Sequence, residues 1–353
     1  MKAWILHETG TIKYEEILAP SVMDGEVLIL VKAVGICGSD IPRIYRDGAH
    51  RMPLICGHEF AGEVVQIGKD VDSRWLGKRV GVFPLIPCRE CTACQQKQYE
   101  MCRNYGYIGS RQDGAFAEYV RAPIQNLIEL PENVSFELAA MLEPMAVAVH
   151  AMRRAEVTQN DKVLVYGLGT IGLLLVMFLL EKEISDIYVI GNKEIQKKAV
   201  LEMGLPEDNF FDSRKDLKEN ESVCSTWINK KTNGKGADIV FECIGKNEIV
   251  SQSIELATIG GKICLVGNPQ SDIILEKSVY WKILRNQLTI LGTWNSSFTQ
   301  EEGDDWHYVL QKLSEGNIQP KKLITHRFAF GELEKGLHIM RDKNEEYIKV
   351  MLT

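Results

Sequence analysis

The sequence predicts an α/β protein of two domains, one β-rich and barrel-like and the other built on a parallel, doubly wound sheet. Three observations support this prediction. Residues 1–150 consist largely of short apolar runs broken by glycine and proline. Residues 151–293 alternate short buried strands with helical stretches. A glycine-rich turn joins the first strand and the first helix of that second segment.

Composition limits the classes of function to consider. The chain has 353 residues, 45% of them hydrophobic and 25% charged, which is enough for two domains that each bury a core. A formal charge of -7 without a basic stripe argues against nucleic-acid and membrane partners. The start, Met1 to Trp4, shows no charged-then-apolar leader, and no apolar run reaches about 18 residues. We therefore expect a cytoplasmic protein.

The β-rich pattern marks both ends of the chain. An apolar run at residues 26–31 is typical of a strand in the first domain. A helical segment after residue 294 leads into a closing strand at residues 348–352, which we expect to rejoin the first domain. The expected domains are residues 1–150 with 294–353, and residues 151–293. The strands expected in the second domain are 162–166, 187–190, 239–242, 263–266 and 288–291.

Four cysteines within fifteen residues form the strongest motif: Cys88, Cys91, Cys94 and Cys102. Their spacing can close a tetrahedral thiolate shell around zinc. An iron-sulfur cluster is the alternative, but the fourth cysteine is too far along the chain and no proline follows it. Nine cysteines, an odd count, also argue against a disulfide framework. Because four thiolates leave no place for a substrate, this zinc is expected to be structural.

A second metal site is predicted from residues that lie in separate segments. Cys37, the pair His58 and Glu59, and Glu143 supply a thiol, an imidazole and carboxylates. Each of these residue types is more often structural when it stands alone. Together they would leave one coordination position open, which a catalytic zinc requires.

The third motif is the turn between residues 163–166, a strand, and the apolar helix that follows. A dinucleotide fold places the cofactor's pyrophosphate at such a turn, where glycines allow close approach and the helix N-terminus attracts anions. The residues expected to bind the cofactor are Gly167, Gly169, Thr170, Ile171 and Gly172.

The next strand ends at Gly191, Asn192 and Lys193. An NAD enzyme usually carries an acid there, which binds the ribose hydroxyls. Glycine removes the bulk and the charge of that acid, and Asn192 and Lys193 are suited to contact a 2'-phosphate. The sequence therefore favours NADP, while the alternative is that Lys193 is solvated and NAD binds through other contacts.

These motifs in this order, joined by residues 109–119, resemble the zinc-containing medium-chain dehydrogenases. Within that family, residues 37–44, 47–50 and 292–294 are similar to those of galactitol-1-phosphate 5-dehydrogenase and sorbitol dehydrogenases. The resemblance implies a GroES-like catalytic domain built from both chain ends and a Rossmann domain between them. It implies that Cys37, His58 and Glu59 are catalytic zinc ligands, and that Glu143 is either a ligand or a partner of the zinc-bound water. Dimers or tetramers of one chain are also implied.

The expected reaction is hydride transfer between a secondary alcohol and NAD(P), with zinc stabilising the alkoxide. Ser39 is the candidate first step of a proton relay, with His50 as a second member. Arginine suits phosphate oxygens, so Arg43 and Arg111 are candidate contacts of a polyol phosphate such as galactitol 1-phosphate. Trp294 is expected to line the same pocket.

Two other functions stay open. The first is a dehydrogenase of a neutral polyol or of L-threonine, which needs no phosphate site. The second is a nucleotide-binding protein without turnover, which predicts the loss of a zinc ligand or of a turn glycine. The sequence shows neither loss.

Overall fold

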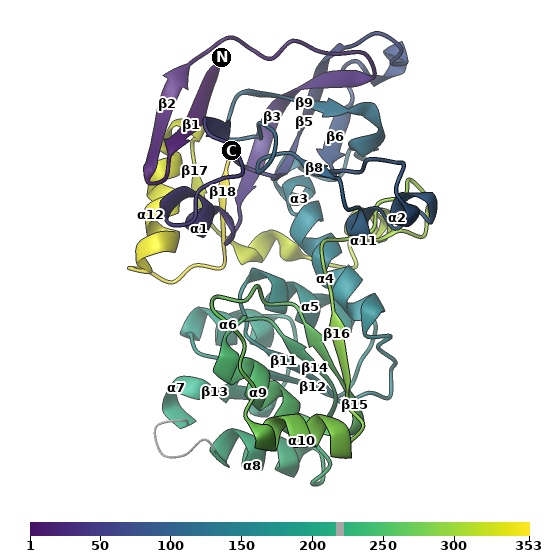
Figure 1. Ribbon diagram of the computed structural model, residues 1–353, viewed down its shortest axis with the longest axis vertical. Coiled ribbons are helices and arrows are strands. Elements are labelled where there is room, and N and C mark those ends of the chain that lie inside the picture. Colours follow the sequence, from purple (N-terminus) through teal and green to yellow (C-terminus); the bar gives the residue numbers. More distant parts are fainter. Residues whose placement is uncertain (217–221) are drawn as a thin grey trace. The chain divides into compact units, whose positions relative to one another are not determined.

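The computed structural model describes residues 1–216 and 222–353 of the chain. The chain divides into two compact units, Met1–Ala146 with Ser296–Thr353, and Val147–Asn295. Both chain ends lie in the first unit (Figure 1). Within the described ranges, no helix has the length and apolar character needed to cross a membrane.

Antiparallel strands dominate the first unit. Its strands are β1 (Lys2–Glu8), β2 (Thr11–Glu16), β3 (Glu26–Ile36), β4 (Leu54–Ile55), β5 (Glu59–Ile67), β6 (Arg79–Val82), β7 (Leu85–Ile86), β8 (Gly106–Tyr107), β9 (Tyr119–Pro123), β10 (Leu127–Glu129), β17 (Ile324–Phe328) and β18 (Lys349–Leu352). The largest sheet has the order β10-β6-β5-β3-β18-β17, with β9 also paired to β3. Strand β18 pairs with β3 through Val350 opposite Ile36, so the C-terminal strand completes the N-terminal sheet.

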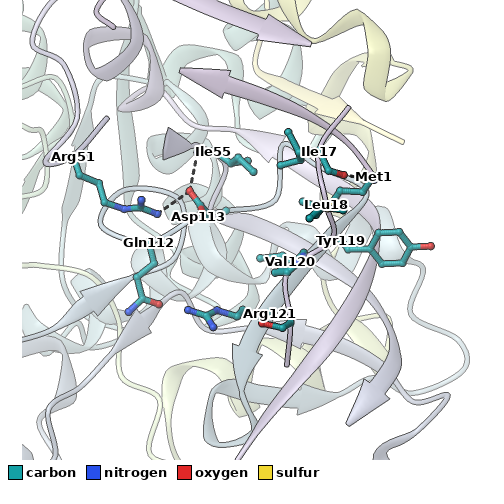
Figure 2. Close-up of a pocket in the computed structure, with 13 residues that line it drawn as sticks. Met1, Ile17, Leu18, Arg51, Ile55, Gln112, Asp113, Tyr119, Val120 and Arg121 are labelled. Carbon is teal, nitrogen blue, oxygen red and sulfur yellow. Dashed lines mark hydrogen bonds and ion pairs between the residues drawn. The ribbon is translucent and has the colours of Figure 1, made fainter. Parts of the chain in front are cut away.

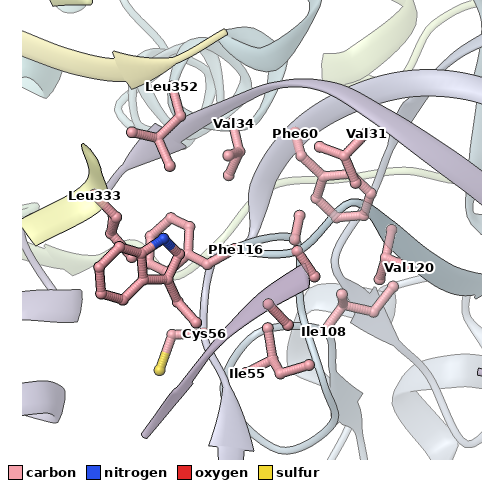
Figure 3. Packing of buried hydrophobic residues seen from close by; sticks show 14 of the residues in the cluster. Val31, Val34, Ile55, Cys56, Phe60, Ile108, Phe116, Val120, Leu333 and Leu352 are labelled. Atoms are coloured by element: carbon pink, nitrogen blue, oxygen red, sulfur yellow. The ribbon is translucent and has the colours of Figure 1, made fainter. Parts of the chain in front are cut away.

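The core of the first unit is built from both ends of the chain. Leu333 and Leu352 belong to the same buried cluster as Val34, Phe60 and Phe116 (Figure 3). Val34 and Phe60 are paired across strands β3 and β5, and Leu352 of β18 is paired with Val34 on its other side. The helices of this unit are α1 (Asp40–Tyr45), α2 (Thr92–Gln95), α3 (Phe136–Ala140), α11 (Asp305–Ser314) and α12 (Leu333–Asp342).

The second unit contains one parallel sheet. Its strands are β11 (Val163–Tyr166), β12 (Ile187–Gly191), β13 (Phe210–Asp212), β14 (Ala237–Glu242), β15 (Ala257–Leu265) and β16 (Thr289–Gly292), in the order β13-β12-β11-β14-β15-β16. All neighbouring pairs are parallel. The predicted doubly wound α/β sheet is confirmed. The sequence missed β13, because this strand has only three residues and lies among polar ones.

Helices connect the strands of this sheet and cover both of its faces. They are α5 (Thr170–Glu181), α6 (Glu194–Glu202), α7 (Ser213–Asp216), α8 (Ser222–Lys231), α9 (Asn247–Leu256) and α10 (Lys277–Arg285), and α4 (Leu142–Arg154) leads into this unit. On one face, Leu164 of β11 packs in a cluster with residues of α8 and α9. A Cβ on Gly172 of α5 would lie 3.5 Å from Val165 Cγ1, which places α5 on the other face.

Candidate functional site

The four cysteines of the predicted structural site converge on one point. Cys91 precedes α2, Cys94 lies within it, and the ligand atoms of all four lie within 4.8 Å of one another. The Sγ atom of Cys91 lies 3.6 Å from that of Cys94 and 4.0 Å from that of Cys102. A tetrahedron with Zn–S bonds of about 2.3 Å has edges of about 3.8 Å, so this spacing fits zinc.

The environment of this cluster favours thiolates at its more exposed positions. Backbone N–H groups of Cys94 and Arg103 stabilise a charged sulfur and lower the pKa of Cys91 to about 6. Burial instead raises the pKa of Cys94 to about 12. A cation bound between the sulfurs would offset the cost of a buried thiolate.

A second donor set lies where strands β3 and β5 pair. Gly35 of β3 is opposite Glu59 of β5, so Cys37, just past the end of β3, comes beside His58 and Glu59. Their ligand atoms lie within 4.8 Å of one another. Gly57 adopts a φ of +92°, and a Cβ there would lie 2.6 Å from the Phe116 ring, so glycine is required before His58.

Asp40, to which the sequence assigned no role, organises this set. It is completely buried, and one carboxylate oxygen accepts a 3.0 Å hydrogen bond from the Cys37 backbone N–H. The other oxygen accepts a 2.6 Å bond from Arg43 and lies 3.6 Å from His58 Nδ1. At this distance the Asp40 carboxylate faces the His58 ring without a hydrogen bond to it, and carboxylates beside metal-binding histidines commonly orient the ring.

Ser39 lies directly beside the thiol. Its hydroxyl donates a 3.2 Å hydrogen bond to Cys37 Sγ, and its backbone N–H lies 3.5 Å from the same sulfur. The hydroxyl oxygen keeps lone pairs that can accept a hydrogen bond. Its role in a relay stays a prediction, as does that of the exposed His50.

Glu143 lies in the first turn of α4, outside the set formed by Cys37, His58 and Glu59. Tyr107, which the sequence did not single out, donates a 3.2 Å hydrogen bond to Glu143 Oε1, and its ring meets the His58 ring edge-on at 5.8 Å. Burial, together with the nearby Glu59 carboxylate, raises the pKa of Glu143 to about 7. The structure thus places Glu143 beside the donor set and in contact with a phenol.

A buried lysine from the C-terminal strand also reaches the centre. Lys349 is 2% exposed, forms an ion pair with Glu59, and donates a 3.0 Å hydrogen bond to the Ile36 carbonyl. Burial and the nearby carboxylates of Glu59 and Asp40 raise the pKa of the Cys37 thiol. A divalent cation bound at this centre would offset the cost of a buried thiolate.

The predicted substrate arginines have different environments. Arg43 is engaged by Asp40, and its side chain is 19% exposed. Arg111 is exposed, and its guanidinium stacks 4.5 Å from the centre of the Tyr105 ring. Trp294 is exposed and lies in the second unit.

A separate cavity of about 600 Å³ in the first unit is bordered by two other arginines, Arg51 and Arg121. Figure 2 shows Arg51 directed to Asp113, which also accepts a hydrogen bond from the Ile55 backbone. Arg121 lies 3.6 Å from Glu26. Both arginines therefore already have acidic partners.

The glycine turn in the second unit has the form that a pyrophosphate needs. Gly167 adopts a φ of +100°, which favours glycine, and follows β11 directly. A Cβ on Gly172 would collide with the Gly167 carbonyl oxygen. Gly169 precedes α5 without a capping side chain, and the N-terminus of a helix attracts an anion.

The end of β12 leaves little room for a larger residue. A Cβ on Gly191 would lie 3.0 Å from the Phe210 ring and 3.1 Å from Gln196 Oε1, which accepts the Asn192 backbone N–H at 3.0 Å. Lys193 precedes α6. On the neighbouring strand β13, Asp212 is the residue opposite Gly191. Asp212 forms a 3.2 Å ion pair with Arg214, and the sequence did not single out either residue.

Comparisons with known proteins agree with this arrangement. Residues 23–132 match the family described as alcohol dehydrogenase GroES-like domain, and residues 170–315 match that described as zinc-binding dehydrogenase. Galactitol 1-phosphate 5-dehydrogenase of Escherichia coli is 30% identical, covering 94% of this chain and 93% of that protein. A sorbitol dehydrogenase of Halalkalibacterium halodurans is 32% identical, covering 98% and 97%. L-Threonine 3-dehydrogenase of Bacillus licheniformis is 32% identical, covering 93% and 92%.

Solved structures show the same fold. Galactitol-1-phosphate dehydrogenase from Escherichia coli superimposes with a TM-score of 0.90 at 30% identity, covering 100% of this chain and 99% of that one. A structure from Sinorhizobium meliloti bound to NADP gives 0.86 at 25% identity, covering 99% and 98%. An Escherichia coli alcohol dehydrogenase in complex with NADH gives 0.88 at 27% identity, covering 100% and 99%.

Proposed function

The chain belongs to the zinc-containing medium-chain dehydrogenases, and from this premise we propose that it oxidises a secondary alcohol of a polyol phosphate, such as galactitol 1-phosphate. The observation that carries the proposal is the open donor set. Cys37, His58 and Glu59 would hold a catalytic zinc and leave a position for substrate, with Glu143 beside them. Cys88, Cys91, Cys94 and Cys102 would hold a second, structural zinc.

When bound, the catalytic zinc would supply a Lewis acid that makes a substrate hydroxyl more acidic, so that its carbon can release hydride to NAD(P). In a proton relay, Ser39 would accept the substrate's hydroxyl proton on its oxygen while passing its own proton to a further acceptor, so its hydroxyl would have to turn away from Cys37 Sγ, to which it donates in this structure. Asp40 fixes the backbone of Cys37 and faces the ring of His58. Tyr107 holds Glu143 at the edge of the site.

The close packing around Gly191 supports our choice of NADP over NAD, because a Cβ there would require the Phe210 ring and the Gln196 side chain to shift. Asn192 and Lys193 follow Gly191 at the start of α6, where a 2'-phosphate would add negative charge near a helix N-terminus. The measurement is the ratio of kcat/KM with NADP to that with NAD. A ratio below one would show that the protein prefers NAD although it lacks a carboxylate at position 191.

We expect substrate phosphate to be recognised through Arg111, since Arg43 is already engaged by Asp40. Arg111→Ala should raise the KM for galactitol 1-phosphate roughly tenfold or more, by removing charge-assisted hydrogen bonds, and leave the KM for free galactitol unchanged. Initial rates with galactitol 1-phosphate, sorbitol 6-phosphate and the free polyols test this. Arg74→Ala is the matched control, because Arg74 also stacks on an aromatic ring, that of Trp75.

The substrate panel also separates the alternatives. Equal rates with phosphorylated and free polyols, and an unchanged KM in Arg111→Ala, would favour a sorbitol-type enzyme. Preference for L-threonine would favour the 3-dehydrogenase reaction of the Bacillus licheniformis relative. Full zinc loading without turnover on any of these substrates would contradict the proposed reaction.

We further propose that two copies of the chain pair along β16, forming a dimer or half of a tetramer. Strand β16 is at the edge of its sheet, and Ile290 on it and Leu284 on α10 are exposed apolar residues. Ile290→Asp should therefore shift the protein to monomer in size-exclusion chromatography with light scattering. Val65→Asp, which charges a similarly exposed apolar residue of the first unit, should not; unchanged mass in both variants would refute pairing at β16.

A further inference from the structure

Lys349 is a buried cation for which hydride transfer has no direct use. It begins β18, and its side chain crosses to the start of β5, where the ammonium group pairs with Glu59 and donates to the Ile36 carbonyl at 3.0 Å. The side chains of Lys349 and Glu59 are 2% and 3% exposed. A lysine is rarely buried this deeply unless an acidic partner holds it.

The neighbouring strand leaves space for this ion pair. A Cβ on Gly35 would lie 2.7 Å from Lys349 Cε and would also collide with the Glu59 carboxylate. The charged groups that act on the ammonium are Glu59, Cys37 and Glu143. The ion pair with Glu59 and the hydrogen bond donated to the Ile36 carbonyl are the interactions of an ammonium group.

We propose that Lys349 is a positioning residue that takes the place of the metal when the centre is empty, holding Glu59 in its ligand position, and that its charge limits how tightly zinc binds. The inference rests on the proposed role of Glu59 as a zinc ligand. An ammonium group and a divalent cation that share one carboxylate repel each other. The Lys349–Glu59 ion pair therefore stabilises the metal-free centre and lowers its affinity for zinc.

Removing the charge should affect the two states differently. In the metal-free protein, Lys349→Met would leave Glu59 as a buried carboxylate without its ion-pair partner, which is a costly change. In the zinc-loaded protein, the metal itself would neutralise Glu59. Thermodynamic linkage then requires zinc to bind the variant more tightly, because the variant destabilises the empty state more than the occupied one.

The experiment measures zinc affinity by competition with a chromophoric chelator, and the melting temperature of the metal-free and loaded proteins. Lys349→Met should bind the catalytic zinc roughly tenfold or more tightly, and its metal-free form should lose more thermal stability than its loaded form. Lys349→Arg keeps the charge and should restore an affinity close to that of the original protein. Unchanged or weaker zinc binding in Lys349→Met would overturn the proposal.

A packing control comes from the next residue of the strand. Val350 is completely buried but is an apolar core residue, so Val350→Ala should lower both melting temperatures equally and leave zinc affinity unchanged. The same pattern in Lys349→Met would show that Lys349 acts only through packing.

A double variant keeps the test decisive if Lys349→Met does not fold. Glu59→Gln with Lys349→Met leaves neither member of the pair charged, and it should bind zinc more tightly than Glu59→Gln alone, because the ammonium no longer repels the metal. Equal affinities would refute the proposal.

Failure of the proposed function gives a different result. If the original protein binds zinc only at the four cysteines, the proposed function itself fails, and the measured stoichiometry is one zinc per chain.

Discussion

Cys37→Ser should remove one of two zinc ions per chain and lower kcat/KM by roughly a thousandfold or more. Serine is a much poorer zinc ligand than a thiolate at neutral pH, and the Lewis acid that would be lost contributes several kcal/mol to the barrier. The change also replaces the sulfur that accepts the Ser39 hydroxyl hydrogen bond with a hydroxyl oxygen. Zinc content by mass spectrometry and initial rates with both cofactors measure the effect.

A nearby buried thiol provides the control for this variant. Cys56 is completely buried in the core of the first unit, two residues before His58, and lies outside both donor sets. Cys56→Ala should retain two zinc ions and most of the activity, with a modest loss of stability from the small cavity. If Cys37→Ser keeps both zinc ions and normal turnover, Cys37 is not a ligand and the open centre is wrongly assigned.

The sequence could predict those parts of the site whose residues lie close together in the chain. The four cysteines lie within one short segment, so their convergence follows from the loop that carries them. The glycine turn is local as well, because one strand, one turn and one helix position Gly167 and Gly172. In both motifs, neighbouring residues in the chain are also neighbours in space, and residue type is enough to indicate the function.

Residues that reach the site through the fold have no such local pattern. Lys349 lies 290 residues from Glu59, and only the pairing of β18 with β3 brings it to the centre. Tyr107 reaches Glu143 from a two-residue strand, β8. Neither residue stands out in the sequence, because a lysine or a tyrosine near polar residues is ordinary. Their roles depend on burial, which the sequence does not display.

The arginines show the opposite case, in which the sequence offers more candidates than the fold can use. Arg43 and Arg111 both carry a group suited to phosphate, and spacing alone does not rank them. The structure distinguishes them, because Arg43 lies on the short helix α1 three residues after Asp40 and donates to it. Arg111 keeps an exposed guanidinium supported by an aromatic ring. Because the contact with Asp40 already engages Arg43, Arg111 is the residue to mutate first.

Cys91→Ser should produce the largest loss of stability among the variants considered. The four-cysteine segment has little regular structure apart from the single turn of α2 and a 3₁₀ turn at Tyr99–Met101, so metal coordination would supply most of its order. Zinc binding of this kind contributes on the order of 10 kcal/mol in small zinc domains, and the loss of one ligand forfeits much of it. We expect loss of one zinc ion, faster thermal inactivation, and protease cleavage within residues 88–102.

The pattern of effects separates the two metal sites. Thr92→Ala, in the same helical turn but without a ligand atom in the cluster, should retain both zinc ions and resist the protease. Cys91→Ser should also keep the open centre occupied, because Cys37, His58 and Glu59 are held by the β3–β5 pairing and not by this segment. Loss of both zinc ions from Cys91→Ser would mean that the segment also supports the catalytic centre. Loss of neither would refute the structural zinc.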